Sequence, residues 1–244
     1  MRTRHAPDSS SLGPVACRHC DLNEVCRLCG LIALGGERTR HPTGRLRQIP
    51  VGASLYRTGT PASCLYAVRQ GLLRIVHVTA EGDEHTLGIA LPGEVLGLET
   101  FAHRAYATDA VALQPTVCCE LPLPLLEQEG TRVRELAEAL IRLLSSSITP
   151  RLERARGSIR NRVTRFLLDL SNRLQRRGLD GRRFTLGLSR QQIADLLDTR
   201  IETVSRMMQR LHRERAIRVH GNTVTLLQRL DVAEAAATSN PMRG

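Results

Sequence analysis

Four cysteines lie within thirteen residues near the start of the chain. Cys17, Cys20 and Cys26 follow a C-x2-C-x5-C spacing, and Cys29 adds a further C-x2-C step. Soft thiolates at such spacing select iron–sulfur clusters or zinc. Because four local cysteines can also complete a tetrahedral zinc site, the spacing alone leaves both metals open.

Basic residues are interleaved with these cysteines. Arg18, His19 and Arg27 are expected to favour the thiolate form that a metal needs, because a nearby positive charge lowers the pKa of a thiol.

A second group of cysteines, Cys118-Cys119, ends a stretch that reads as a strand. Adjacent strand residues point to opposite faces, so these two thiols are not expected to serve one site together. Cys119 shares its face with Val117 and Leu121, whereas Cys118 shares its face with a threonine and a glutamate. We therefore predict that Cys119 is the inward, shielded thiol. Cys64 is expected to be a small buried hydrophobe.

The segment 198–211 reads as an amphipathic helix, because apolar residues recur at spacings of three and four. Its other face carries side chains that can address base edges in the major groove of DNA. Arginine suits guanine, glutamate suits the cytosine amine, and serine suits several partners. Taken alone, the stretch could equally be a solvated helix face. The predicted base-reading residues are Glu202, Ser205, Arg206 and Gln209.

The neighbouring segments favour a winged helix-turn-helix. A shorter amphipathic helix is predicted over 189–197, with Ser189 as its N-cap, and a short turn separates it from 198–211. Downstream, 217–226 reads as a hairpin around a two-residue Gly-Asn turn. Helix, turn, helix and hairpin in this order are typical of a DNA-binding domain.

Positive charge is concentrated in the same third of the chain. The whole chain carries a net charge of +11, and all 35 of its basic residues are arginines. Between 158 and 220, fifteen arginines face six acidic residues, a local net of +9, which is typical of a DNA-binding surface. Arg190 and Arg200, at the starts of the two helices, are expected to contact phosphate, which guanidinium groups bind well.

The sequence contains no membrane-targeting signal. No apolar run approaches the roughly 18 residues that a membrane span needs. No apolar segment follows Arg2 and Arg4, as it would in a signal peptide. We therefore expect a cytoplasmic protein with reduced cysteines and no membrane partner.

The middle of the chain is predicted to be a β-barrel. Residues 45–122 contain short runs rich in β-forming residues, separated by glycines at regular intervals. Many short strands with such turns predict a jelly-roll barrel.

A long helix is predicted over 131–156, and Pro150 should kink it because proline removes a backbone hydrogen bond. Its near-heptad apolar stripe could simply pack on the barrel. We favour a dimer seam, because a long helix between two domains is a natural one. Another amphipathic helix is predicted over 159–175. The predicted dimer-interface residues are Leu136, Leu140, Leu144, Ile148 and Leu152.

The order of these segments resembles the CRP/FNR family of bacterial transcription regulators, and most closely its oxygen-sensing FNR branch. The resemblance covers roughly residues 15–232 and rests on three motifs. These are the cysteine arm, the Cys-Glu-Leu-Pro segment at 119–122, where that branch places its fourth ligand, and Ile-Glu-Thr-Val-Ser-Arg at 201–206, which resembles its recognition helix. The implied fold class is α+β: an N-terminal cysteine arm, a jelly-roll barrel of the cyclic-nucleotide-binding type, a long dimerisation helix and a C-terminal winged helix-turn-helix.

The resemblance implies one 4Fe-4S cluster per subunit, held by Cys17, Cys20, Cys26 and Cys119. Cys29 departs from the family pattern as an extra thiol beside the arm, which leaves it open as an alternate ligand. In this branch the intact cluster favours a homodimer, which binds a palindrome of the TTGAT…ATCAA kind in double-stranded promoter DNA and works with RNA polymerase. Oxygen degrades the cluster and ends DNA binding.

The sequence departs from the family pattern at a few positions. Relatives that bind cyclic nucleotides carry an Arg-Ser pair where this chain has Tyr106-Ala107, so cAMP binding is not expected. Asp198 stands where the family has a small turn residue. Arg200 takes the expected N-cap position of the recognition helix, which suggests that Thr199 provides the cap instead.

The predicted organisation is an arm (1–40), a β-roll sensor domain (41–130), a dimerisation helix (131–157), a DNA-binding domain (158–232) and a tail (233–244). One alternative is the same DNA binder with a structural zinc or thiol-redox site in place of the cluster. Another is an iron–sulfur enzyme or electron carrier. Because the sequence contains no nucleophile–base constellation and no phosphate loop, we expect no enzymatic activity.

Overall fold

The computed structural model describes residues 12–31, 45–127, 133–153 and 157–227. Within the long helix, the side chains of residues 146–153 are not described, so the predicted interface residues Ile148 and Leu152 lie outside the described side chains. The predicted tail also lies outside the described residues. No helix in the described ranges is both long and apolar enough to cross a bilayer.

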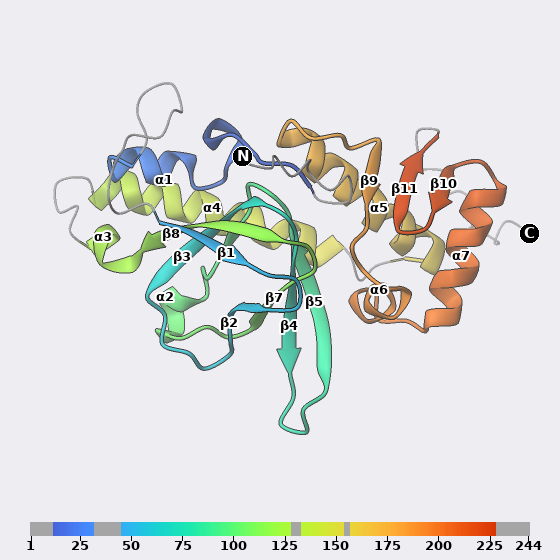
Figure 1. Cartoon of the computed structure of the whole chain (residues 1–244), viewed down its shortest axis with the longest axis horizontal. Coiled ribbons are helices and arrows are strands. Elements are labelled where there is room, and N and C mark those ends of the chain that lie inside the picture. Colours follow the sequence, from blue (N-terminus) through green and yellow to red (C-terminus); the bar gives the residue numbers. More distant parts are fainter. Residues whose placement is uncertain (1–11, 32–44, 128–132, 154–156, 228–244) are drawn as a thin grey trace, which may run out of the picture.

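Two four-stranded antiparallel sheets form the predicted jelly roll, called here the roll (Figure 1). One sheet has the strand order β1 (Leu46–Ile49), β8 (Thr116–Pro122), β3 (Cys64–Gln70), β6 (Val95–Leu96). The other has the order β2 (Ser54–Tyr56), β7 (Asp109–Ala112), β4 (Leu73–Val78), β5 (Glu84–Ala90). Short helices α2 (Thr100–His103) and α3 (Leu123–Glu127) complete the roll.

Aromatic rings fill part of the roll's interior. Tyr56 stacks on Tyr106 with ring centroids 4.0 Å apart, and Tyr66 lies 5.9 Å from Tyr56. The Tyr106 hydroxyl donates a hydrogen bond to the carbonyl of Cys64, which is itself half-buried. The roll therefore has a packed aromatic core between its two sheets.

The cysteine arm, residues 12–31, lies along one outer face of the roll. It forms a 3₁₀ turn, η1 (Cys17–His19), and a short helix, α1 (Asn23–Leu28). Helix α1 runs beside the long helix α4 (Val133–Glu153), which continues through Pro150 (Figure 1). Apolar side chains of the arm, of α4 and of strands β3 and β8 form one buried cluster, called here the arm cluster.

The packing of α4 corrects the predicted dimer stripe. Leu136 is buried against its own chain in the arm cluster, and Leu140 is partly buried there. These two side chains are therefore not exposed for pairing with a second subunit. Of the predicted residues, Leu144 is exposed, and Ile141, which was not predicted, is exposed beside it. The sequence pattern was misleading because α4 has apolar residues on two sides, and the arm and the roll cover the side that carries Leu136 and Leu140.

The C-terminal half, residues 157–227, is the predicted winged helix-turn-helix with one more strand than expected. Helix α5 (Ile159–Arg176) begins at the N-cap Ser158, and α6 (Arg190–Leu196) begins at Ser189 with a full capping box. Helix α7 (Ile201–Arg213) follows after a tight turn. The wing is a three-stranded sheet in the order β10 (Ile217–His220), β11 (Thr223–Leu226), β9 (Arg183–Thr185).

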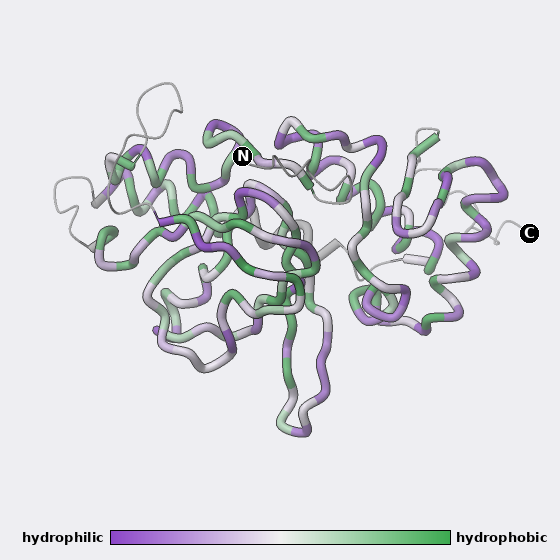
Figure 2. The backbone as a smooth tube through the Cα atoms, in the orientation of Figure 1, coloured by the Kyte–Doolittle hydropathy of each residue, from purple (hydrophilic) through white to green (hydrophobic). Residues whose placement is uncertain are grey.

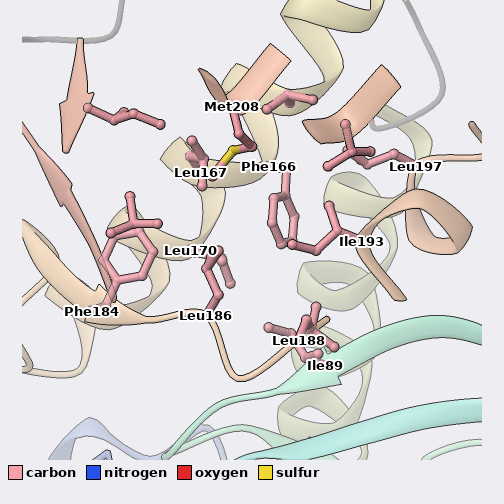
Figure 3. Close-up of a cluster of buried hydrophobic side chains, with 14 of the residues drawn as sticks. Ile89, Phe166, Leu167, Leu170, Phe184, Leu186, Leu188, Ile193, Leu197 and Met208 are labelled. Atoms are coloured by element: carbon pink, nitrogen blue, oxygen red, sulfur yellow. The ribbon is translucent and has the colours of Figure 1, made fainter. Parts of the chain in front are cut away.

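The two halves share one hydrophobic core. Ile89 of β5 packs against Leu188 and Ile193 at the start of the helix-turn-helix (Figure 3). Gly187, with φ +65°, lies so close to Leu72 of the roll that an added Cβ would collide with that side chain. Hydrophilic residues are frequent along α7, which lies at the end of the molecule away from the roll (Figures 1 and 2). The fold therefore holds the DNA-binding half against the roll and leaves α7 outermost.

Candidate metal centre and nucleic-acid interface

The two cysteines of strand β8 point to opposite faces, as predicted. Cys118, and not Cys119, is the one that points into the roll. Cys118 is fully buried in the interior of the roll. Cys119 is half-buried and packs against the arm cluster on the outer face. The prediction that Cys119 points inward is therefore wrong. Alternation could not identify the faces, because the arm and α4 bury the outer face as well.

The outer face of β8 brings Cys119 to the arm cysteines. Cys20, Cys26 and Cys119 all pack against the arm cluster, although about ninety residues separate Cys119 from the arm. Cys17 lies in η1, before Cys20 in the chain. The side-chain amide of Asn23 donates a hydrogen bond to the Cys17 carbonyl over 2.9 Å. The predicted thiols therefore come from two distant segments to one wall of the roll.

The thiols lie within electrostatic range of one another. Burial raises the pKa of Cys20 to about 12, and thiolate charge on Cys119 or Cys17 would raise it further. Burial also raises the pKa of Cys26, with smaller contributions from Cys20, Cys119, Cys29 and Cys17. The Cys20 and Cys26 thiols are thus protonated at neutral pH in the metal-free protein, and metal binding must release those two protons.

These shifts correct the expectation that basic neighbours favour thiolates. Arg18 and Arg27 are exposed, and no cation is among the causes of the pKa shifts of Cys20 and Cys26. Burial dominates because the thiols face the apolar arm cluster rather than solvent.

The donor chemistry of this site is that of soft thiols beside an apolar wall. A structural zinc would draw four sulfurs to about 2.3 Å from one centre. An iron–sulfur cluster instead spreads its cysteine ligands around several iron atoms. Within the described ranges, no three His, Cys, Asp or Glu side chains are grouped closely enough to hold one metal ion. Thiols suit both metals, so the assignment of Cys17, Cys20, Cys26 and Cys119 to a cluster stays a prediction.

Cys29 remains close to the same group. It is 7% exposed in the arm cluster, and its charge contributes to the raised pKa of Cys26. Its place at the C-cap of α1 puts it one helical turn after Cys26. The role of Cys29 as the alternate ligand therefore stays a prediction.

The face of α7 that points away from the core carries the predicted base readers. Glu202, Arg206 and Gln209 are exposed and Ser205 is half-buried, whereas the opposite face of α7 is buried. The first turn carries Glu202. The helix therefore offers a carboxylate, a guanidinium, an amide and a hydroxyl to an approaching groove.

A hollow lies between α6, α7 and the wing. Arg190, Ser205, Gln209 and Arg213 line it together with apolar Met208 and Val219. Burial lowers the pKa of Arg190, which remains charged because arginine titrates far above neutral pH. Two guanidinium groups beside the reading helix suit a phosphate of the DNA backbone.

Other arginines form ion pairs or hydrogen bonds that hold α7 in place, and are not predicted to contact bases. Arg210 pairs with Glu214 over 2.8 Å, and Glu214 pairs with Arg160 of α5 over 2.7 Å. Arg200 is exposed at the N-cap of α7, which has no side-chain cap, so the predicted cap by Thr199 is not formed. Asp198 has a left-handed φ of +47°, and Arg162 donates hydrogen bonds to the carbonyls of Leu197 and Asp198.

Comparison with known proteins agrees with this architecture. Residues 46–129 match the cyclic nucleotide-binding domain, and residues 161–233 match the Crp-like helix-turn-helix domain. The chain is 30% identical over 224 residues to the transcriptional activator protein anr of Pseudomonas aeruginosa, covering 90% of this chain and 92% of that protein. This chain belongs to the CRP/FNR family.

One further relative and one solved structure are informative. The fumarate and nitrate reduction regulatory protein of Vibrio cholerae is 26% identical, with 92% of each chain covered. The structure of FixK2 from Bradyrhizobium japonicum has a TM-score of 0.69 at 24% identity, covering 79% of this chain and 96% of that one, and it supports the fold alone. As a CRP/FNR protein, this chain is a DNA-binding transcription regulator.

Sequence reasoning missed a group of charged residues between the halves of this CRP/FNR protein. Arg173 of α5 makes a bidentate ion pair with Glu94 of the roll, with N–O distances of 2.6 and 2.8 Å. Arg177, one turn later, pairs with Asp21 of the arm over 2.6 Å. One signal was available, because Arg173 lies between Leu170 and Leu174 within the apolar stripe of α5.

Proposed function

We propose that this protein is an FNR-type regulator that holds one 4Fe-4S cluster per subunit and loses DNA binding when oxygen destroys that cluster. The ligands are Cys17, Cys20, Cys26 and Cys119. One observation supports this proposal above the others: Cys119 faces the arm cysteines across a shared apolar wall. The relatives with anaerobic names, the fumarate and nitrate reduction regulatory proteins, support it further.

When bound, an iron–sulfur cluster of this kind reacts with oxygen and is lost, which supplies the chemical signal. The chain's own residues supply the rest. The Cys20 and Cys26 thiols release their protons on binding, and the arm cluster shields Cys20, Cys26 and Cys119 from water. Cys20 and Cys26, on the arm, and Cys119, on the roll, tie two segments together that are otherwise joined by packing and ion pairs.

The arm is also tied to α4, the proposed dimer helix. Glu24 of α1 pairs with Arg142 of α4 over 2.7 Å. Arg142 directly follows Ile141, whose side chain is 61% exposed. We assign the pairing face of a homodimer to Ile141 and Leu144, so that an ordered arm stiffens the helix that carries this face.

The DNA target is a palindrome of the TTGAT…ATCAA kind in double-stranded promoter DNA, read by Glu202, Ser205, Arg206 and Gln209 of α7. Two subunits place two reading helices one DNA turn apart, and RNA polymerase is the partner at the promoter. Arg190 and Arg200 contact phosphate. The site of action is the cytoplasm.

No response to cAMP is proposed. Tyr56, Tyr66 and Tyr106 pack together inside the roll, and Tyr106-Ala107 stands where nucleotide-binding relatives carry Arg-Ser. The roll therefore acts as the support for Cys119 and not as a nucleotide sensor.

A zinc-holding form is the second candidate, because Cys29 lies near Cys26 and could replace Cys119 as the fourth ligand. Iron, sulfide and zinc counting on anaerobically purified variants separates the two. For a cluster, Cys119→Ser abolishes iron and sulfide, whereas its neighbour Cys118→Ser, which points into the roll, retains both. Unchanged metal content in Cys119→Ser, with zinc lost in Cys29→Ser, would support zinc and contradict the cluster.

A further inference from the structure

A charged junction joins three parts of the chain that the proposed switch treats separately. It comprises Asp21 of the arm, Glu94 of the roll, Arg173 of α5 and Arg177 at the C-cap of α5, and is called here the junction. Arg177 bridges the parts, because its Nη2 lies 2.6 Å from Asp21 and 3.7 Å from Glu94. Arm, roll and DNA-binding half therefore meet at one guanidinium group.

The junction is shielded from water. The side chains of Arg173, Arg177 and Glu94 are 11%, 10% and 15% exposed, whereas that of Asp21 is 36% exposed. Arg173 also donates a hydrogen bond to the carbonyl of Ile89 over 2.8 Å. Ion pairs with so little solvent contact hold their geometry far better than surface pairs do.

Backbone contacts fix the arm at the same place. The Asp21 amide donates a hydrogen bond to the carbonyl of Gly93 over 2.8 Å. Gly93 has φ +91°, and an added Cβ would lie 2.6 Å from Cδ of Arg177 and 2.9 Å from the carbonyl oxygen of His19. Arm, roll and α5 are thus in such close contact that only glycine fits between them.

The junction lies directly beside the cysteine site. Asp21 follows Cys20 in sequence, and His19 precedes it. An arm that leaves the wall of the roll would withdraw the Asp21 carboxylate from Arg177. It would leave that guanidinium with Glu94 at 3.7 Å as its nearest carboxylate among the described residues.

We infer that Asp21 and Arg177 are positioning residues, through which the seated arm holds the DNA-binding half of its own subunit in the docked arrangement. In that arrangement the base-reading face of α7 is exposed, so the docked half is the DNA-competent one. The arm thus acts on DNA binding directly through α5, in addition to any effect on the dimer helix. The Asp21–Arg177 contact requires only that the arm be packed against the roll, whichever metal the arm holds.

A double-mutant cycle tests this inference on the full chain, purified anaerobically, with Asp21→Asn, Arg177→Gln and the double variant. Two quantities are measured: affinity for a palindromic DNA duplex at fixed salt, and hydrogen exchange of the amides at 89–93 and 186–193, where roll and DNA-binding half pack. Each single variant should weaken DNA binding by about fivefold or more, the lower end of ordinary allosteric coupling. Each should also speed exchange in both segments.

The double variant should be no weaker than the worse single variant, because the two residues act through one contact. Asp21→Glu, which keeps the charge, should recover most of the affinity. Glu24→Gln is the matched control: it removes the arm's other ion pair, to Arg142 of α4, and should leave exchange at 186–193 unchanged. Additive losses in the double variant, or unchanged exchange in both single variants, would overturn the inference.

Iron content is measured in parallel. It separates a failure of the inference about Asp21 and Arg177 from a failure of the proposal that the protein holds a cluster. Arg177→Gln changes the C-cap of α5 and removes no thiol, so it should keep the metal content of the unaltered protein while DNA binding weakens. A protein without iron would defeat the cluster proposal, yet the exchange data from Arg177→Gln would still decide the inference. Weakening in Arg177→Gln that merely follows metal loss would count against it.

Discussion

The Glu94–Arg173 pair offers the sharpest energetic prediction. Glu94 accepts two hydrogen bonds from the Arg173 guanidinium and one from the Leu91 amide, at 2.6–2.9 Å. Removing one partner of a buried ion pair costs about 3–5 kcal/mol, because the other charge stays buried without compensation. In Glu94→Gln, Arg173 would keep Asp169 at 3.1 Å and the Ile89 carbonyl. We therefore expect a loss of about 2–3 kcal/mol in the free energy of unfolding, below the full range.

Urea unfolding of the metal-free full chain measures this loss with two probes. The chain has no tryptophan, and its three tyrosines all lie in the roll, so tyrosine fluorescence reports the roll. Circular dichroism at the helical band reports mainly the helices. The two transitions should coincide in the unaltered protein, and in Glu94→Gln the helical transition should move to lower urea and separate from the other.

Two further variants make the result specific. Arg134→Gln removes a pair with Glu138 in which the arginine is 91% exposed, and it should cost only about 0.3–0.5 kcal/mol. Replacing both Glu94 and Arg173 by apolar residues should recover at least about 1 kcal/mol relative to Glu94→Gln, since the buried guanidinium is then removed together with its main partner. Asp169, which also loses Arg173, is 23% exposed and reaches water. A Glu94→Gln loss no larger than that of Arg134→Gln would refute the claim that this pair holds the two halves together.

The remaining predictions concern pH, DNA and the helix-turn-helix turn. Burial would raise the pKa of Glu94, but Arg173 and its hydrogen bonds outweigh burial and hold the pKa below the ordinary value of 4.5. The stability difference between the unaltered protein and Glu94→Gln should therefore be complete above pH 4.5 and vanish as pH falls through the lowered pKa, as urea midpoints at several pH values would show. Glu202→Ala and Arg206→Ala should each cost about 1–3 kcal/mol in DNA binding and relax base preference, measured by competition between half-site variants. Arg190→Ala should weaken all sequences alike and reduce the slope of affinity against salt in filter-binding titrations. Asp198→Gly should stabilise the metal-free chain by about 0.5 kcal/mol in urea unfolding, because glycine adopts the observed φ of +47° without strain.

Local patterns identified helices α4, α5, α6 and α7 and most strands, but not the short helices α1, α2 and α3. Ser189 and the apolar spacing of 201–211 predicted α6 and α7, although α7 begins three residues later than expected, after a tight turn at Asp198. Strands β1, β6, β7 and β9 were missed. Three of the four residues of β1 are exposed, and β6 has only two residues. Alternation and periodicity therefore predict a strand or helix where one of its faces is buried and the other is exposed to solvent.

Tertiary contacts decided the features that sequence reasoning misjudged. Both faces of β8 are buried, so alternation placed Cys119 on the wrong one. One face of α4 packs against the arm cluster and another faces solvent. Leu136 was predicted to lie in the dimer interface, but it is buried in the arm cluster. The Asp21–Arg177 contact joins residues 156 positions apart, and no local pattern can reveal a pair at such separation.

The switch itself is tested most directly by DNA binding before and after air. The protein is purified without oxygen, its iron–sulfur absorbance is recorded, and its affinity for a TTGAT…ATCAA duplex is measured by gel shift; a second portion is then aerated and measured again. The account predicts a coloured protein with tight, site-specific binding that bleaches in air and loses affinity in proportion. A colourless anaerobic protein with full site-specific binding, or binding that survives complete bleaching, would contradict it.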